Sequence, residues 1–289
     1  MMGALCFLAM GAMAESIVPI NIWSKPDPSR MLEFVDTYDP LTITEENPIY
    51  LYNADAHRFF VGANDYQTRA SLGERGAKVW FKRSTEPNML AYLAIWNFVP
   101  RSDVNGNRNV FTDDGGNTWV DRNQQNHYSW TVSKVYDFYR LQNARFVNTD
   151  PTTGKFLGWK GDDNDMRLYL LDSYDGYCDW YFATPASYQK YEGELDRYEA
   201  GEALRKALID AEECGIDINE SLEVYKNKES TLEQLIAAKE AVEKSIPVGV
   251  NIVSYVQRVA NAVYNLNGQR VNGLQRGINI VDGQKIMVK

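Results

Sequence analysis

Short runs of aromatic and β-branched residues, separated by polar turns, recur along the chain from about residue 47 to residue 184. Trp80, Trp130 and Trp180 are spaced by fifty and fifty residues, and each lies within such a run. Runs of this composition, bounded by Gly, Asn and Asp, are typical of β-strands. The pattern therefore predicts strands in this region, organised as three repeats of about fifty residues.

Each predicted repeat contains four apolar segments in the same order. The first segments are 50–53, 94–97 and 140–143, the second are 59–60, 110–111 and 156–157, and the third are 70–72, 118–120 and 168–171. The fourth segments contain the three tryptophans, and polar turns at 62–65, 113–116 and 161–165 separate the second and third segments. One unit of four short strands cannot bury its apolar face alone, so we expect the three units to close around a shared core. The sequence thus predicts a mainly β fold of twelve strands over 47–184.

This threefold arrangement resembles the ricin-type β-trefoil lectin family over about 140 residues. In that family a Gln-x-Trp signature marks the last strand of each repeat. The three tryptophans match the signature, whereas Lys78, Tyr128 and Cys178 replace the glutamine. The resemblance implies a β-trefoil of three four-stranded repeats and a glycan ligand. A small β-sandwich is the alternative fold, because alternating short strands satisfy it as well.

Residues 185–246 change to helical spacing. Thr184-Pro185 is typical of an N-cap followed by proline at the first helical position, and Gly215 is a termination signal. Apolar residues recur at helical intervals between them, at Leu204, Leu208 and Ala211. A capping box at 230–233 predicts the start of a second helix. We therefore expect a small α-helical hairpin, which resembles the FIVAR-like helical modules of extracellular bacterial proteins.

The last part of the chain, 247–289, returns to alternating apolar and polar residues. Asn267-Gly268 and Asp282-Gly283 are strong hairpin-turn signals, and they predict a C-terminal β-hairpin over 260–289. The order Tyr-Asn-x-Asn-Gly-x-Arg followed by Gly-x-x-x-Val-x-Gly resembles the final strands of the C-terminal sorting domain of type IX secretion. The resemblance implies an export signal; the alternative is a purely structural C-terminal clasp.

The first residues have the pattern of a targeting segment. Residues 1–14 form a short apolar run that ends in Ala12-Met13-Ala14, a small-residue cleavage pattern before Glu15. We interpret the run as a secretory signal peptide, and no other segment is apolar enough over the length of a membrane-spanning helix. Residues 15–46 contain four prolines and are expected to form an extended lead-in. Residues 50–73 also resemble trefoil-like modules in secreted proteins of anaerobic Gram-negative bacteria. An extracytoplasmic protein, secreted or on the outer surface of a Gram-negative bacterium, is therefore expected.

Charge and cysteine content restrict the functional classes. The formal net charge of −9 argues against nucleic acid as a partner, because phosphate binding needs basic patches. Residues 186–246 hold 15 acidic and 8 basic residues, which indicates a solvated helical face or, alternatively, a docking surface for a protein partner. Three cysteines are too few for a cysteine-built zinc site. After signal-peptide removal Cys178 and Cys214 remain, either as one disulfide or as two buried thiols.

Motifs of catalysis and cofactor binding are missing from the sequence. It contains no Gly-x-Ser-x-Gly, no Walker-type loop and no dinucleotide-binding glycine pattern. The two histidines, His57 and His127, lack metal-ligand spacing. The acidic turn at 161–165 lacks the glycine and closing glutamate of a calcium-binding EF-hand loop, so we expect a solvated turn. We therefore expect no catalytic residue, no metal and no cofactor. A hydrolase with an accessory trefoil is a third hypothesis, although no second region has the length of a catalytic domain.

Carbohydrate sites pair an aromatic ring, which packs on the apolar C–H face of a sugar, with Asp or Asn that bonds to hydroxyl groups. Three loops offer this mixture, and their candidate residues are Asn64, Asp65, Tyr66 and Gln67; Asp113, Asp114, Asn117 and Trp119; and Trp159, Asp162, Asp163 and Asn164. The repeated tryptophans are instead expected in the core. The sequence thus predicts a non-catalytic, lectin-like carbohydrate-binding protein. The alternative is a protein-interaction or structural surface component with no sugar ligand.

Overall fold

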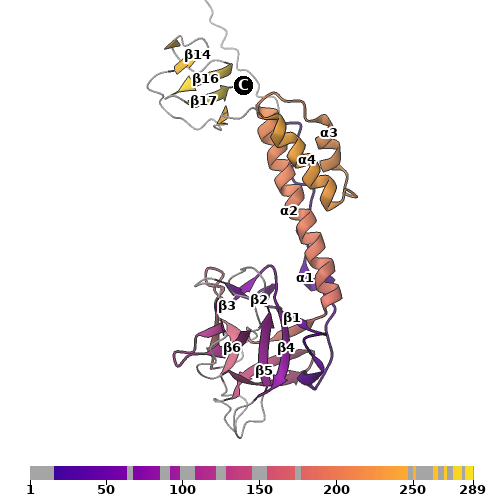
Figure 1. The fold of residues 1–289 in the computed structure, drawn as a ribbon, viewed down its shortest axis with the longest axis vertical. Coiled ribbons are helices and arrows are strands. Elements are labelled where there is room, and N and C mark those ends of the chain that lie inside the picture. Colours follow the sequence, from indigo (N-terminus) through magenta and orange to yellow (C-terminus); the bar gives the residue numbers. More distant parts are fainter. Residues whose placement is uncertain are drawn as a thin grey trace, which may run out of the picture. The chain divides into compact units, whose positions relative to one another are not determined.

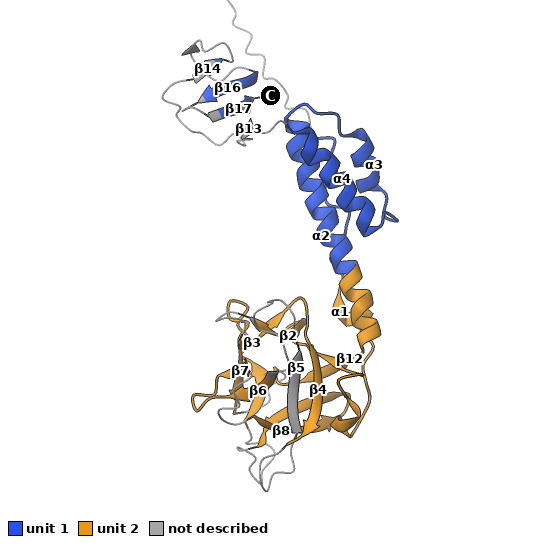
Figure 2. Cartoon of the chain, viewed as in Figure 1, with its two compact units in different colours: residues 1–25, 194–289 blue, residues 26–193 orange. Residues whose placement is uncertain are grey.

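The chain forms two compact units (Figure 2), one of residues 26–193 and one of residues 1–25 and 194–289. Within them, the computed structural model describes residues 16–63, 68–84, 92–97, 108–121, 128–144, 155–172, 177–246, 250–251, 263–265, 270–271, 276–281 and 284–288. The signal peptide predicted for 1–14 therefore lies outside the described residues. The long helix α2 (Pro185–Glu213) contributes its first residues to the 26–193 unit and the rest to the other unit.

The 26–193 unit contains a sheet of twelve strands in its described residues (Figure 1). The strands are β1 (Ile49–Asn53), β2 (Arg58–Ala63), β3 (Arg69–Gly73), β4 (Lys78–Arg83), β5 (Tyr92–Asn97), β6 (Arg108–Thr112), β7 (Thr118–Asp121), β8 (Ser129–Val135), β9 (Phe138–Asn143), β10 (Phe156–Trp159), β11 (Leu168–Leu171) and β12 (Trp180–Ala183). Each apolar segment predicted from the sequence coincides with one of them. The prediction of a mainly β fold is confirmed, and all the strand pairs of this sheet are antiparallel.

Six of these strands pair in a closed ring. Strand β1 pairs with β4 and β12, β5 pairs with β4 and β8, and β9 pairs with β8 and β12, all antiparallel. The other six strands form three hairpins, β2–β3, β6–β7 and β10–β11. Backbone hydrogen bonds join each hairpin to the other two, from Val120 N–H to Thr68 O, from Leu170 N–H to Gly116 O and from Leu72 N–H to Met166 O. A closed ring protects the edges of its strands from pairing with other chains.

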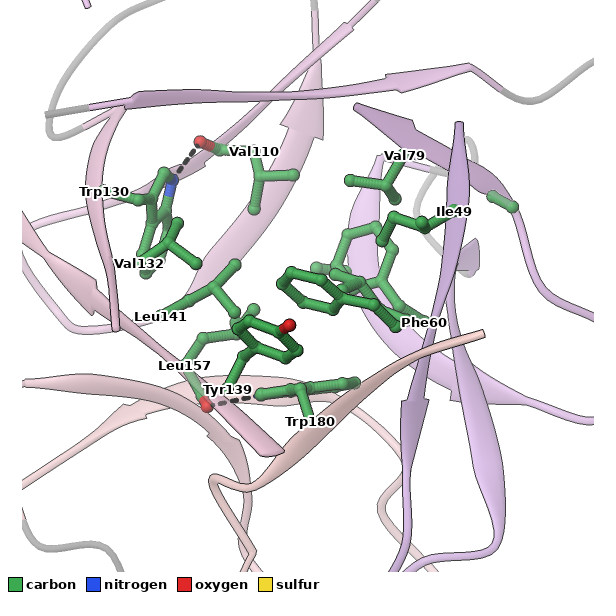
Figure 3. Packing of buried hydrophobic residues seen from close by; sticks show 14 of the residues in the cluster. Ile49, Phe60, Val79, Val110, Trp130, Val132, Tyr139, Leu141, Leu157 and Trp180 are labelled. Carbon is green, nitrogen blue, oxygen red and sulfur yellow. Dashed lines mark hydrogen bonds between the residues drawn. The ribbon is translucent and has the colours of Figure 1, made fainter. Parts of the chain in front are cut away.

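The three repeated tryptophans lie in the core, as the sequence predicted. Trp80, Trp130 and Trp180 are at most 1% exposed. Figure 3 shows the indole N–H groups of Trp130 and Trp180 donating to Val110 O at 2.8 Å and Leu157 O at 3.0 Å. Buried polar groups are normally paired in this way. Trp130 thereby links β8 to β6, and Trp180 links β12 to β10.

The second half of the expected lead-in packs on the strands of this unit. It includes the short helix α1 (Pro28–Met31) and the 3₁₀ helix η1 (Pro40–Thr42). Val35 N–H donates to Phe182 O at 2.7 Å, and Thr184 N–H donates to Glu33 O at 2.9 Å. Ile43 is 1% exposed and belongs to the core. These contacts place residues 33–35 along β12.

The start of α2 follows the predicted signals. The hydroxyl of Thr184 accepts a hydrogen bond from Ser187 N–H at 3.3 Å, and Pro185 occupies the first helical position. The ring of Tyr188 stacks on Tyr50 with centroids 3.6 Å apart, and its hydroxyl accepts from Gly76 N–H at 2.8 Å. The first turn of α2 is thereby fixed to the 26–193 unit.

Three helices, not the predicted two, are present in the helical segment. Between α2 and α4 (Leu232–Ser245) lies α3 (Asn219–Lys226), which buries Leu222 and Tyr225. Helix α3 has eight residues and no side-chain N-cap bond, so its periodicity was too short to be recognised in the sequence. The prediction of a helical hairpin was therefore wrong in the number of helices.

The ends of these helices agree with the sequence signals to within one residue. Gly215 has φ of 71°, and the N–H groups of Gly215 and Ile216 donate to Glu212 O and Ala211 O in a Schellman motif. The capping box of α4 is formed by Thr231 and Gln234, one residue later than predicted. On α4, Lys239 pairs with Glu243 and Lys244 pairs with Glu240, each across one helical turn. These surface ion pairs support the interpretation of a solvated face.

The first part of the lead-in belongs to the helical unit. Ile22 N–H donates to the Tyr225 hydroxyl at 3.2 Å, and the indole N–H of Trp23 donates to Tyr225 O at 3.1 Å. A Cβ atom at Gly201 would lie 2.7 Å from the Trp23 ring, so glycine is required there. The lead-in predicted for 15–46 is therefore divided between the two units.

The C-terminal residues form a five-stranded sheet in the order β13 (Val250–Asn251), β17 (Gln284–Val288), β16 (Gly277–Val281), β14 (Val263–Asn265) and β15 (Arg270–Val271). Strands β16 and β17 pair on both sides of residues 282–283, as the predicted hairpin requires. The turn residues Asn267, Gly268, Asp282 and Gly283 lie outside the described residues. The hairpin is thus part of a larger sheet, which includes one parallel pair, β13 with β17.

Two further properties concern membranes and disulfides. Among the helices that the structure describes, none has the length and apolar character needed to cross a membrane. Neither Cys178, which is buried in the 26–193 unit, nor the half-buried Cys214 of the helical unit takes part in a disulfide bond. Of the two alternatives, a disulfide between Cys178 and Cys214 or two thiols, the structure therefore has two thiols.

Candidate functional site

The outer sides of three neighbouring strands carry aromatic rings in one row. Tyr52 of β1 is paired with Tyr181 of β12, and Trp180 is paired with Tyr139 of β9, which places Phe138 beside Tyr181. Because successive side chains of a strand point to opposite faces, Tyr181 and Phe138 point away from the core that contains Trp180. The ring centroids of Phe138 and Tyr181 are 6.3 Å apart.

A ring from the lead-in extends this row. Phe34, held beside β12, has its ring centroid 4.7 Å from that of Tyr181 and 6.3 Å from that of Tyr52. Phe34 is 38% exposed, Phe138 and Tyr181 are half-buried, and Tyr52 is buried beneath them. We call Phe34, Phe138 and Tyr181 the aromatic face. Phe34 is the most exposed of the three rings, whereas the Arg140 guanidinium lies 5.1 Å from the ring centroid of Phe138 and covers part of that ring.

An ion pair lies next to the aromatic face, two residues from Phe138 on β9 and two residues from Tyr181 next to β12. Arg140 Nε donates to Asp179 Oδ1 at 2.8 Å, and the two side chains are only 14% and 16% exposed. Burial raises the pKa of Asp179, and the neighbouring Asp55 adds to the increase, although Arg140 opposes both. Burial also raises the pKa of Tyr181, with further contributions from the negative charges of Asp137, Asp179 and Asp55. Three carboxylates are therefore near enough to Tyr181 to influence its pKa.

The arrangement of charges has an energetic consequence. A carboxylate whose pKa is raised in spite of an arginine partner loses more by leaving water than it gains from the pair. Such a pair adds little to folding, and perturbed ionisable groups of this kind cluster at functional sites. Next to exposed rings, a carboxylate and a guanidinium can exchange hydrogen bonds with hydroxyl groups while the rings pack on C–H groups. Within the described part of the chain, His, Cys, Asp and Glu form no group of three or more that could hold a metal ion.

The residues predicted from the sequence lie elsewhere. Asn64, Asp65, Tyr66 and Gln67 fall outside the described residues. Asp113, Asn117 and Trp119 do come together, in the turn between β6 and β7. The Asp113 carboxylate accepts hydrogen bonds from Asn117 N–H at 2.9 Å and from Trp119 Nε1 at 3.0 Å. Burial alone would raise the pKa of Asp113, but these donors outweigh it and hold the pKa below its usual value.

The polar groups of the turn between β6 and β7 form hydrogen bonds with one another. The Asp113 carboxylate is engaged by the backbone and by two side chains of the same turn, so its acceptor capacity serves the local fold. Asp114 is exposed beside it. The prediction that these residues offer a prepared set of sugar contacts is therefore not supported by their bonding, although their proximity to one another is observed.

The prediction for the third loop is contradicted by the burial of its aromatic residue. Trp159, proposed as a stacking residue, is 5% exposed and belongs to the core. Its indole N–H donates to Asp165 O at 2.9 Å, and Asp162 Oδ1 accepts from Asn164 N–H at 2.9 Å. Asp163 is exposed. Trp159 therefore anchors the turn from inside and presents no open ring face to a ligand.

The rings that remain in this region are covered by cations. The Arg69 guanidinium lies 5.0 Å from the ring centroid of Trp119 and 4.8 Å from that of Tyr169, and Lys160 Nζ lies 3.6 Å from the Tyr169 centroid. Arg69 is 3% exposed, and it donates hydrogen bonds to carbonyl oxygens of both neighbouring hairpins. This stack joins the three hairpins, one residue from each, and two cations lie over the ring of Tyr169.

Sequence reasoning missed the aromatic face and its ion pair. Alternation along 179–182 does contain a signal, since it turns Asp179 and Tyr181 away from the buried Trp180 and Phe182. The register that brings Phe138 and Arg140 beside them joins positions about forty residues apart. Local patterning cannot supply that register, nor the position of Phe34.

Comparison with known proteins gives limited information. No family model matches the chain, and no curated protein matches it. Similar solved structures include a complex of lysenin with phosphocholine, with TM-score 0.38, 15% identity and coverage of 49% of this chain and 45% of that one. Others are the lysenin pore (0.37, 14%, 52% and 49%) and a GlcNAcα1-4Gal-releasing endo-β-galactosidase from Clostridium perfringens (0.35, 11%, 48% and 32%). The matches span less than half of each of those chains, so the function must be argued from the site itself.

Proposed function

We propose that residues 26–193 form a β-trefoil that binds carbohydrate without catalysis. The ring of six strands and the three hairpins support the trefoil assignment, because each third of the unit contributes the same four strands in the same order. The core tryptophans and the Arg69, Trp119 and Tyr169 stack both repeat at intervals of fifty residues. A fold of this kind does not determine a function, so the ligand is inferred from the site.

The observation that carries the proposal is the aromatic face next to the Asp179–Arg140 pair. The rings of Phe34, Phe138 and Tyr181 offer an apolar surface to the C–H groups of a sugar, and the charged pair offers an acceptor and donors to its hydroxyls. The pair is already held in one geometry, so a ligand does not have to order it on binding.

A binding role is favoured over hydrolysis. Glycosidases in general place two carboxyl groups on either side of one glycosidic bond. Asp179 is instead engaged by Arg140, which suits an acceptor of hydroxyl hydrogen bonds. We also propose an extracytoplasmic location, supported by the signal-peptide pattern of residues 1–14 and by the sorting-like tail.

A glycan array probed with the chain from residue 15 onward tests the proposal. The variants are Tyr181→Ala, which removes a ring of the face, and Asp179→Asn, which keeps the shape of the acceptor but not its charge. Ile236→Ala is the control, because Ile236 is 43% exposed on α4 in the other unit.

The expected result is binding of at least one glycan by the unmodified protein and by Ile236→Ala, with affinity lowered about tenfold or more in both site variants, equivalent to ~1.4 kcal/mol. Circular dichroism should give folded spectra for all four proteins. Absence of binding to every glycan, or binding that is indifferent to both site variants, would overturn the proposal. Turnover of any polysaccharide would overturn its non-catalytic part.

A further inference from the structure

The turn between β8 and β9 holds a tyrosine in an unusual conformation. Val135 pairs with Phe138, so Tyr136 and Asp137 form a two-residue turn. Tyr136 has φ of 55°. Such turns normally use glycine, asparagine or aspartate at positive φ, and a bulky side chain there costs folding free energy.

The side chain of Tyr136 gains nothing visible from the fold in return. It is 87% exposed, and among the residues that the structure describes it makes no hydrogen bond and no ring contact. A strained residue persists where the surrounding structure holds it, and such residues cluster at ligand-binding positions. Here the strain presents an aromatic ring to solvent at the tip of a hairpin.

The position of the tip relates this ring to the aromatic face. Phe138, a member of that face, lies two residues further along the chain, and the intervening Asp137 influences the ionisation of Tyr181. Two residues of fully extended chain span roughly 7 Å, so the backbone of Tyr136 lies within about that distance of Phe138. Tyr136 is thus near Phe138 along the chain, and Phe138 is beside Tyr181 across the strands.

We propose that Tyr136 is a second stacking residue and that the ligand is an extended, neutral oligosaccharide. This inference rests on the proposed carbohydrate-binding function. A single sugar ring on Tyr181 would not reach the tip, whereas a chain of several sugars lying along the face contacts both positions. The exposed Asp137 lies in the turn between Tyr136 and Phe138, whereas Asp179 is already paired with Arg140. The negative charge of Asp137 between the two rings disfavours acidic sugars, which selects a neutral chain.

Calorimetric titration with a length series of the glycan identified on the array tests this inference, from the monosaccharide to the hexasaccharide. The proteins are the unmodified chain, Tyr136→Gly, Tyr136→Phe, Tyr181→Ala and, as a control for loss of an exposed apolar side chain, Ile20→Ala in the other unit. Glycine suits positive φ, so Tyr136→Gly removes the ring without opposing the turn. A parallel series of a sulfated or carboxylated form of the same glycan tests the charge argument.

The unmodified protein should bind longer chains more tightly, and Tyr136→Gly should lose about 3- to 10-fold in affinity for the long chains only, as expected for one aromatic contact. Tyr136→Phe and Ile20→Ala should match the unmodified protein, and the Tm of Tyr136→Gly should stay equal or rise. Acidic glycans should bind more weakly than neutral ones.

The outcomes separate this inference from the proposed function. If no glycan binds, or Tyr181→Ala has no effect, the proposed function fails and the inference with it. If Tyr181→Ala weakens binding while Tyr136→Gly behaves as the unmodified protein at every length, only the role of Tyr136 is overturned. A Tm lowered by several degrees in Tyr136→Gly would show that the ring serves the fold, and tighter binding of acidic glycans would overturn the neutral class.

Discussion

The inner and outer faces of the ring strands carry aromatic residues for different reasons. Inside, the three tryptophans recur at fifty-residue intervals and are at most 1% exposed. The residue that follows each tryptophan differs between the repeats: it is Phe81, which is itself buried in the core, Thr131 or Tyr181. The repeated positions therefore serve the shared core, whereas the half-buried ring of Tyr181 is specific to one third of the unit. The residues that pack the core recur in all three repeats, whereas the candidate site lies at positions where the repeats differ.

The largest expected effect separates the two faces by stability. Trp180→Ala should lower the free energy of unfolding by about 3–5 kcal/mol, because a fully buried indole is lost and a cavity remains. Tyr181→Ala should lower it by about 1 kcal/mol, since its ring is half exposed. Urea unfolding followed by far-ultraviolet circular dichroism measures both. Equal losses in the two variants would mean that the outer ring belongs to the packed core.

The same contrast explains what could be predicted from the sequence. The twelve strands were predictable because their apolar runs recur with the tryptophans, and each recurrence reinforces the others. The start of α2 at Pro185 and its end before Gly215 were predictable because each end carries a local signal. Helix α3 has neither recurrence nor a side-chain cap, and it was missed.

The candidate site required information that local patterns do not contain. Tyr181, Phe138 and Phe34 come from three segments that only the strand register and the lead-in bring together. Trp159 was mistaken for a ligand contact because its loop is polar, whereas strand β10 ends at Trp159 and buries it. A polar neighbourhood in the sequence does not reveal which way a ring points.

An intermediate effect is expected within the inner face itself. The indole N–H of Trp130 donates to Val110 O, whereas that of Trp80 is buried without a hydrogen-bond partner among the described residues. Trp→Phe removes the same atoms at both positions, but at Trp130 it also leaves a buried carbonyl oxygen without its donor. We expect Trp130→Phe to cost about 1–3 kcal/mol more than Trp80→Phe in the free energy of unfolding. Similar costs in urea unfolding would show that these two repeats are energetically equivalent despite their different bonding.

The smallest expected effect concerns the pH dependence of the outer face. Burial raises the pKa of Asp179 in the folded protein above that in the unfolded chain. Between the two pKa values the folded state keeps a proton that the unfolded state has lost, so this carboxyl makes the free energy of unfolding decrease as pH rises. Asp179→Asn lacks that titration. The stability of the unmodified protein relative to Asp179→Asn should therefore be greatest near pH 3 and should decline by about pH 6, a range set by the usual carboxyl pKa values.

Urea unfolding of both proteins across this range measures the difference, and Trp180→Phe is the control, because a core substitution should leave the pH slope of the unmodified protein unchanged. A relative stability that rises with pH would mean that Arg140 outweighs burial and that the pair stabilises the fold. The expected decline would mean that the charged pair opposes folding near neutral pH. A pair that opposes folding would be consistent with the proposed role in binding a ligand, in contrast to the tryptophans behind it, which are explained by the core alone.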